Sequence, residues 1–277
     1  TWIEQTIEGG FSNVFNGVAH DGTGQWVAVG SQGEIQSWDG IAATWTKETA
    51  AASYGGSFYG VAHDGAAKWV AVGMSGEIQS WDGSAGIWTQ EATGGTNFYE
   101  VAYDGTGLWV AVGSGGKIET SSDGSSWTPQ TAAAGYADAF NGIAYDAGAG
   151  LWTAVGSYGE IQTSPNGSDW TRRFPAGGYT DAFRGVAHGS GLWTAVGIGG
   201  EIQTSCGLLC GGPVSISDTT GTIAFNEVSI LPAGTMDYLL RATISNIEDG
   251  DTITFGFDAS GVVATGEVSG QSLSVSG

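Results

Sequence analysis

The stretch FYEVAYDGTGLWVAVGSGGKIETSSDGSSWT, residues 98–128, decides the fold, because recognisable copies of it recur through the first 205 residues. It contains four short tracts rich in β-branched and aromatic residues, and glycine-rich turns separate them. That composition is typical of short strands joined by tight turns. We therefore treat the stretch as one structural unit and ask how often it is repeated.

Three landmarks identify five copies. The first is a leading phenylalanine, spaced by 43, 40, 42 and 43 residues: Phe15, Phe58, Phe98, Phe140 and Phe183. The second is the tryptophan of W-[VT]-A-V-G: Trp26, Trp69, Trp109, Trp152 and Trp193. The third is a tract that begins at Glu34, Glu77, Lys117, Glu160 and Glu201. A period in the low forties made of strands indicates the blades of a β-propeller.

The fourth landmark, a Trp-Thr pair after a turn, occurs at Trp45, Trp88, Trp127 and Trp170 but is missing after Glu201. Trp2 in TWIEQT matches Trp45 in TWTKET, so residues 2–6 could supply the outermost strand of the last blade, whose other strands lie at 183–205. Pairing the two ends within one sheet would close the ring. The sequence thus predicts an all-β fold with a five-bladed β-propeller over residues 1–205.

The turn before the fourth landmark carries a family resemblance. The segments SSDGSSW at 121–127 and SPNGSDW at 164–170 resemble the Asp box of sialidase-like (BNR-type) propellers, and SWDGIAATW and SWDGSAGIW are looser copies. The resemblance covers residues 1–205 and implies that the box folds the hairpin between the third and fourth strands. It places Asp39, Asp82, Asp123 and Asn166 in that turn. Asp boxes occur in enzymes, binding proteins and assembly factors, so the resemblance implies a fold rather than a function.

Composition narrows the classes of partner. Seven basic residues against 28 acidic ones give a formal net charge of −21, which argues against nucleic acid and anionic membranes. No apolar run approaches the roughly 20 residues of a membrane span, so direct membrane insertion is not expected. The chain begins at Thr1 rather than at Met, and we therefore expect a processed or partial product.

The residue after each leading phenylalanine changes chemistry from blade to blade while its surroundings repeat. These residues should ring the upper mouth of the central channel: Asn16, Tyr59, Tyr99, Asn141 and Arg184. Glu100 follows Tyr99 at the same mouth. Such variation is what a binding site on a repetitive scaffold would show, and it is also what drift at a solvated position would show.

The long upper connections contain Tyr54, Tyr136 and Tyr179 in glycine-rich settings, with Asp138 and Asp181 nearby. Aromatic rings beside carboxylates can bind sugars, because rings stack on apolar sugar faces. The alternative is that these rings pin the loops onto the blade below. The glutamates of the third landmark are expected to make a structural hydrogen bond to a neighbouring blade.

The repeat lacks the combinations of side chains that a catalytic or metal-binding site requires. A sialidase-type site needs a cluster of arginines, and the chain has only Arg172, Arg173, Arg184 and Arg241. The glycine-rich turns that contain an aspartate offer one carboxylate each, whereas a calcium site needs about six or more ligands. We therefore predict a protein that is not an enzyme, with no metal site and no cofactor; calcium binding lacks support.

The repeat stops after Ser205. Residues 206–212 read as a linker in which Cys206 and Cys210 form a disulfide or remain two free thiols. Residues 213–277 show alternating apolar residues and turn signals that resemble a small immunoglobulin-like β-sandwich domain, although they are short for one. We expect this domain to dock on the propeller or to borrow a strand from a neighbouring chain.

These patterns favour a non-enzymatic extracellular structural or adhesion protein that displays a propeller as an interaction module on a cell surface, an appendage or the exterior of a virion. Its partner would be a protein, or another copy through self-assembly of the C-terminal domain, as in a filament. The first alternative is a carbohydrate-binding lectin that binds a glycan on the upper face. The second is a polysaccharide-active hydrolase.

Overall fold

The computed structural model describes residues 3–42, 44–83, 87–92, 94–206, 252–256 and 263–267. These residues form strands and single 3-10 turns, with no α-helix among them. No helix in the described part of the chain is long and apolar enough to cross a membrane. The described residues fall into two units, one with the repeated sheets and one with a single strand pair, and each is described by itself.

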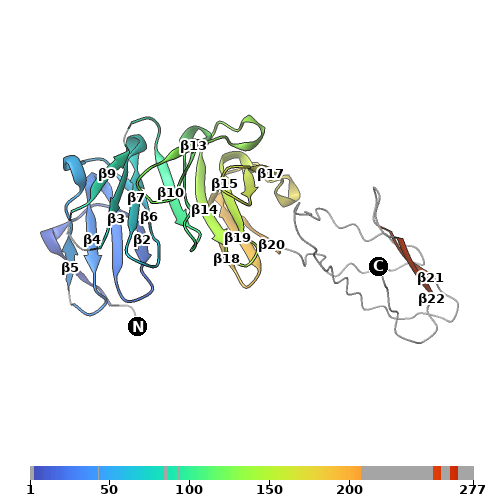
Figure 1. Cartoon of the computed structure of the whole chain (residues 1–277), viewed down its shortest axis with the longest axis horizontal. Coiled ribbons are helices and arrows are strands. Elements are labelled where there is room, and N and C mark those ends of the chain that lie inside the picture. The colour runs from blue at the N-terminus through green and yellow to red at the C-terminus, as the bar shows by residue number, and fades with distance from the viewer. Residues whose placement is uncertain are drawn as a thin grey trace. The chain divides into compact units, whose positions relative to one another are not determined.

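Four antiparallel strands in chain order build each of the first four blades (Figure 1). Blade 1 contains β2 (Phe15–His20), β3 (Trp26–Gly30), β4 (Ile35–Trp38) and β5 (Thr44–Lys47). Blade 2 contains β6 (Phe58–His63), β7 (Trp69–Gly73), β8 (Ile78–Trp81) and β9 (Thr89–Ala92). Blade 3 contains β10 (Phe98–Tyr103), β11 (Trp109–Gly113), β12 (Ile118–Ser121) and β13 (Thr128–Gln130).

Blade 4 contains β14 (Phe140–Asp146), β15 (Leu151–Gly156), β16 (Ile161–Ser164) and β17 (Thr171–Arg173). Blade 5 has three strands among the described residues: β18 (Phe183–Gly189), β19 (Leu192–Gly197) and β20 (Ile202–Cys206). Short 3-10 turns connect strands and blades: η1 (Glu8–Gly10), η2 (Ser31–Gly33), η3 (Ala51–Ser53), η4 (Met74–Gly76), η5 (Ser114–Gly116), η6 (Ala133–Gly135), η7 (Ser157–Gly159), η8 (Ala176–Gly178) and η9 (Ile198–Gly200).

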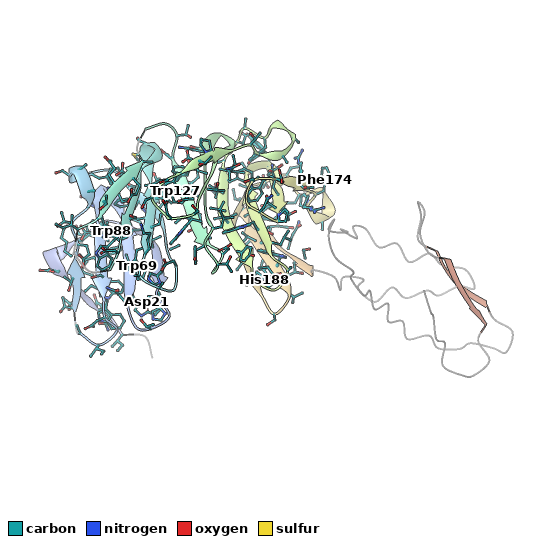
Figure 2. All side chains as sticks on the ribbon, in the orientation of Figure 1. Asp21, Trp69, Trp88, Trp127, Phe174 and His188 are labelled. Carbon is teal, nitrogen blue, oxygen red and sulfur yellow. The ribbon has the colours of Figure 1, made fainter. Side chains whose placement is uncertain are left out.

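The core of the array lies between blades rather than within them. The inner strands pack in the order β2, β6, β10, β14, β18. At each interface, a Val/Ile face of one blade meets the face of the next blade that carries its leading phenylalanine, which we call the Phe/Val face. Between blades 1 and 2, for example, Val29 and Ile35 pack against Phe58 and Trp69. Trp69 and Trp88, both fully buried, are labelled in Figure 2. The repeated landmarks are therefore inter-blade contacts.

The predicted ring closure is not confirmed. Instead of completing blade 5, the N-terminal segment forms β1 (Thr6–Ile7), which pairs in parallel with β5 of blade 1. Only seven residues separate β1 from β2, so blade 1 is the nearest sheet with an open outer edge. Among the described residues, blade 5 has three strands and the sheets do not close into a ring. The repeated four-stranded sheets of the propeller prediction are confirmed in blades 1 to 4.

The second unit contributes one described element, the antiparallel pair of β21 (Thr252–Gly256) and β22 (Val263–Glu267). Ile253 of β21 pairs with Gly266 of β22, and Phe255 pairs with Ala264. The predicted immunoglobulin-like domain otherwise lies outside the described residues, as does the linker after Cys206. Cys206 ends β20, but Cys210 is not described, and the disulfide stays a prediction.

Candidate functional site

Every inner strand carries an irregularity just after its leading phenylalanine. In β10 the register shifts between Phe98 and Glu100, and the same shift recurs in the other four blades. A β-bulge inserts one unpaired residue and re-aims its side chain. The residue that follows each phenylalanine, Tyr99 in blade 3, is therefore the one that leaves the ladder. This backbone device repeats even though the side chain at the position does not.

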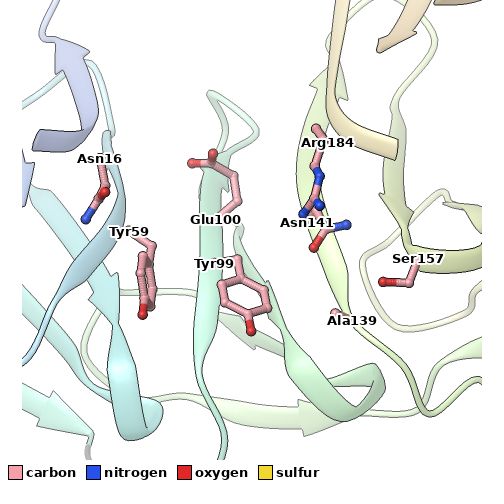
Figure 3. Close-up of a pocket in the computed structure, with 8 residues that line it drawn as sticks. All are labelled: Asn16, Tyr59, Tyr99, Glu100, Ala139, Asn141, Ser157 and Arg184. Atoms are coloured by element: carbon pink, nitrogen blue, oxygen red, sulfur yellow. The ribbon is translucent and has the colours of Figure 1, made fainter. Parts of the chain in front are cut away.

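A cavity of about 510 Å³ lies among the inner strands (Figure 3). All five side chains predicted at the channel mouth line it, together with Glu100, Ala139 and Ser157: the five are Asn16, Tyr59, Tyr99, Asn141 and Arg184. The structure thus brings these residues together, and their binding role stays a prediction. Ala139 and Ser157 were not predicted, because a small side chain in a connection gives no signal in the sequence.

Two of the lining residues also join neighbouring blades. The Nδ2 of Asn16 donates a hydrogen bond of 2.7 Å to the carbonyl oxygen of Phe58, and Asn141 makes the same bond to Phe183. Among the described residues the Oδ1 atoms of both asparagines lack a hydrogen bond. Each amide therefore holds two inner strands together and keeps one acceptor available to a ligand.

An aromatic pair and two opposite charges complete the cavity. The rings of Tyr59 and Tyr99 meet edge to face, with centroids 5.5 Å apart. The carboxylate of Glu100 accepts one long bond, 3.3 Å, from the N–H of Val101. Burial raises the pKa of Glu100 to about 7, because this single bond compensates little of its lost hydration. Arg184 lines the same cavity. The described residues include no ion pair for either charge.

Blade 3 departs from the repeat at Glu100, where the other four blades have glycine: Gly17, Gly60, Gly142 and Gly185. The neighbouring inner strands approach closely here. A Cβ built on Gly60 would lie 2.9 Å from the Cα of Glu100. Blade 3 thus introduces a carboxylate at a crowded position that the other blades keep free of a side chain.

Blade 3 also differs on its third strand. In blade 2, Glu77 accepts hydrogen bonds from Gln79 and Gln90 of its own sheet. The expectation of a glutamate bonded to a neighbouring blade is therefore wrong for this residue. In blade 3 the equivalent residue is Lys117. Its Nζ lies 4.0 Å from the ring centroid of Phe98 and 3.3 Å from the Oε1 of Glu119. This lysine covers the ring that a loop tyrosine covers in blades 2, 4 and 5.

Those loop tyrosines, Tyr54, Tyr136 and Tyr179, pack rather than line the cavity. The Oη of Tyr136 donates to the carbonyl oxygens of Ala139 (2.8 Å) and Ser157 (3.2 Å). Its ring contacts Phe140 with centroids 4.7 Å apart. Burial raises the pKa of Tyr136. Tyr54 and Tyr179 make equivalent contacts. The structure supports their pinning role, and their binding of a sugar stays a prediction.

The aspartates of the glycine-rich turns accept hydrogen bonds from the backbone of their own turns. The Oδ1 of Asp123 accepts the N–H groups of Ser126 (2.7 Å) and Ser125 (2.8 Å), which hold the pKa of this carboxyl well below its usual range. Asp21 accepts three backbone N–H groups in the same way. These aspartates form turns. Within the described residues no group of three or more His, Cys, Asp or Glu side chains could hold a metal ion.

Comparisons with known proteins confirm the β-propeller fold. No family model and no curated protein matches the chain. The WD40 β-propeller domain of Doa1 superposes with a TM-score of 0.57 and 13% identity, over 70% of this chain and 66% of that one. YCF48 bound to D1 peptide superposes with a TM-score of 0.55 and 16% identity, over 70% and 63%.

The chain therefore spans just under two thirds of the length of each of these two structures. At such low sequence identity the likeness shows the fold alone. The resemblance to the sialidase-like Asp-box type is not confirmed by these comparisons.

Proposed function

We propose that this protein is a non-enzymatic interaction module that binds an extended peptide segment of a partner protein in the cavity at the channel mouth. One observation carries the proposal. The five residues that follow the leading phenylalanines differ in chemistry from blade to blade, yet they share a single cavity, and the unusual Glu100 joins them there.

The lining favours a peptide that carries a basic side chain. Tyr59 and Tyr99 offer aromatic surface, and Glu100 offers a carboxylate without a cationic partner among the described residues. A cation beside an aromatic ring and a carboxylate is bound by both. The net charge of −21 attracts cationic partners over longer distances. The free Oδ1 atoms of Asn16 and Asn141 would accept backbone N–H groups of the peptide.

The absence of catalysis is part of the same proposal. Glycoside hydrolysis generally requires two carboxyl groups on opposite sides of the bond that breaks. Glu100 is the only carboxyl among the lining residues. This supports a binding cavity rather than a polysaccharide-active site. An extracellular location on a cell surface, appendage or virion, with a role in adhesion, completes the proposal and rests on the acidic, lysine-poor composition.

A lectin is the second candidate, and the Tyr59–Tyr99 pair favours it. Aromatic rings next to amides are the side chains that bind sugars. The loop tyrosines contribute less to this candidate, because their hydroxyl groups bond to the backbone. A glycan array probed with the purified protein tests it. Glycan binding that disappears in Tyr99→Ala, without any peptide binding, would replace the peptide proposal.

The test of the peptide proposal is selection from a random peptide library, followed by calorimetric titration of the selected synthetic peptides. We expect the peptides to be enriched in Lys or Arg and to bind more weakly at high salt. Glu100→Gly, which restores the residue that the other blades have, should weaken binding at least tenfold. Tyr99→Ala should weaken it as well.

Tyr158→Ala is the matched control, because Tyr158 is exposed and does not line the cavity. It should leave the affinity unchanged. Selected peptides without basic residues, or unchanged affinity in Glu100→Gly, would contradict the assignment of Glu100. Failure of the library to yield any peptide at this cavity would contradict the proposed function itself.

A further inference from the structure

The two ends of the blade array expose side chains whose equivalents are buried or partly buried at the interior interfaces. On β2 of blade 1, Val18 is 59% exposed, whereas its equivalent Val61 on β6 is 6% exposed. Phe15 on the same strand is 36% exposed, whereas Phe58 is fully buried. Blade 1 therefore presents an uncovered copy of the Phe/Val face that blades 2 to 5 pack against the preceding blade.

Blade 5 exposes the opposite kind of face. Val196 on β19 is 44% exposed and Ile202 on β20 is 68% exposed. Their equivalents in blade 3, Val112 and Ile118, are buried against Phe140 of blade 4. The two uncovered faces are thus not alike. One is the Phe/Val half and the other the Val/Ile half of the same interface.

Among the described residues, the backbone N–H of Gly200 in blade 5 lacks a hydrogen-bond partner as well. In blade 3 the N–H of Gly116 donates to the carbonyl oxygen of Asp138, two residues before the next leading phenylalanine. Gly33 and Gly159 make the equivalent bond. Gly200 occupies this position in blade 5, and nothing lies within 4 Å of a Cβ built on it. In blade 1 the corresponding acceptor is the carbonyl oxygen of Asn13, two residues before Phe15.

We propose that the blade 5 face of one copy of this protein binds the blade 1 face of a second copy, head to tail, and so forms the inter-blade interface once more between chains. Val196 and Ile202 pack against Phe15 and Val18 of the second copy. The N–H of Gly200 donates to the carbonyl oxygen of its Asn13. Side-chain complementarity then matches that of the four interfaces within the chain, and the backbone hydrogen bond matches that of three of them.

Rigid packing favours a second copy over closure of one chain onto itself. The leading phenylalanines of blades 2 to 5 are fully buried in their interfaces. Bringing blade 5 onto blade 1 would require these close-packed interfaces to rotate, and packed interiors resist such changes. Moreover, the N-terminal strand β1 extends blade 1 rather than blade 5. A second copy covers one of the two faces, and a third copy the other, without altering any existing interface.

The contact is heterologous, because two different faces meet. Each bound pair keeps one free face of each kind, so further copies add until a ring closes or a filament grows. The charge of −21 on every copy opposes association, and salt screens that repulsion. Assembly should therefore increase with protein concentration and with ionic strength, opposite to the salt dependence of binding a basic peptide.

Two substitutions test the proposal, one on each face. Val18→Asp and Ile202→Asp place a carboxylate at exposed positions, so both variants should fold, which circular dichroism verifies. Sedimentation velocity of the full chain from about 1 to about 100 μM shows the assembly state. We expect wild-type oligomers that grow with concentration, and monomers for each variant alone. An equimolar mixture should form discrete dimers, because each variant keeps one intact face.

Ile41→Asp is the control, since Ile41 is 90% exposed and lies on neither face. It adds the same charge and should assemble like the wild type. Wild-type monomers at every concentration and salt level would overturn the proposal, and so would a mixture that yields no dimers. Oligomers that persist in Val18→Asp would likewise overturn it, since assembly would then use another surface.

Discussion

Phe98 and Phe15 are the same residue at the same position of two blades, yet Phe98 is fully buried and Phe15 is 36% exposed. Blade 2 covers Phe98, and no blade within the described part of the chain covers Phe15. The comparison between interior interfaces and array ends teaches that one blade cannot bury its own hydrophobic face. The repeat encodes an interface rather than a self-sufficient sheet, as expected for stacked repeats.

Replacing the leading phenylalanine should give the largest difference in stability between an interior interface and an end of the array. Phe98→Ala opens a cavity in a packed interface and should lower the free energy of unfolding by about 3–5 kcal/mol. Phe15→Ala should lower it by roughly 1 kcal/mol, because the partly exposed ring loses less burial. Urea unfolding at low protein concentration, where copies do not associate, measures both. Equal losses would mean that Phe15 is covered in solution.

Two equivalent glycines test whether the backbone is more crowded at an interior interface than at the end of the array. Gly116 and Gly200 both have positive φ, 69° and 80°, so alanine strains either one by about 1–2 kcal/mol. At Gly116 the new Cβ would also collide with the carbonyl oxygen of Tyr136. We expect Gly116→Ala to cost roughly 3 kcal/mol in total and Gly200→Ala only the strain. Thermal unfolding compares them, and equal costs would contradict the open end at Gly200.

The sequence predicted the blades well because each landmark is a packing position. Phe98 and Trp109 recur wherever an interface needs them, and their spacing locates the strands. The N-terminal strand could not be predicted in the same way. Thr6 and Ile7 pair with Thr44 and Trp45 along the backbone, and backbone pairing has no side-chain signature. The match of Trp2 to Trp45 therefore did not identify the sheet that the segment joins.

The cavity was predictable for a related reason. Tyr99 and Asn141 differ where their surroundings repeat, and the bulge places both in one cavity. The role of Tyr136 was not predictable. Its ring reaches Phe140 because Ala134 in the preceding turn adopts a φ of 53°, and an alanine gives no sequence signal for that conformation. Whether a loop aromatic packs or faces solvent depends on such turns.

The third prediction concerns the charge buried between interior strands. Glu100 has a folded-state pKa of about 7, above the ordinary value of 4.5. The folded state therefore binds more protons between these values, and stability falls as the pH rises from about 4.5 to about 7. Glu100→Gln removes this penalty. We expect it to raise the free energy of unfolding by up to about 3 kcal/mol at pH 8 and to change it little at pH 4.

The difference between variant and wild type at each pH is the quantity to measure, because the other acidic residues titrate in both proteins. Urea unfolding at pH 4, 6 and 8 provides it. A gain of the same size at pH 4 and pH 8 would show that the ionised carboxylate is not the cause. The end of the array offers the matched control, since Gly185→Gln places an amide where no further strand crowds it.

The smallest predicted effect is one that interior and end blades should share. Tyr158 holds a φ of 58° at a turn position where blades 3 and 5 have Gly115 and Gly199. Its side chain is 67% exposed, so Tyr158→Gly loses little packing and relieves left-handed strain. The free energy of unfolding should rise by about 0.5 kcal/mol, strain relief being partly offset by the greater unfolded-state entropy of glycine.

Conversely, Gly115→Ala and Gly199→Ala should destabilise the protein equally, because neither position has a close neighbour. Thermal unfolding of the three variants checks this. Unequal losses at the two glycines would mean that the difference between interior and end extends beyond the interface residues into the turns.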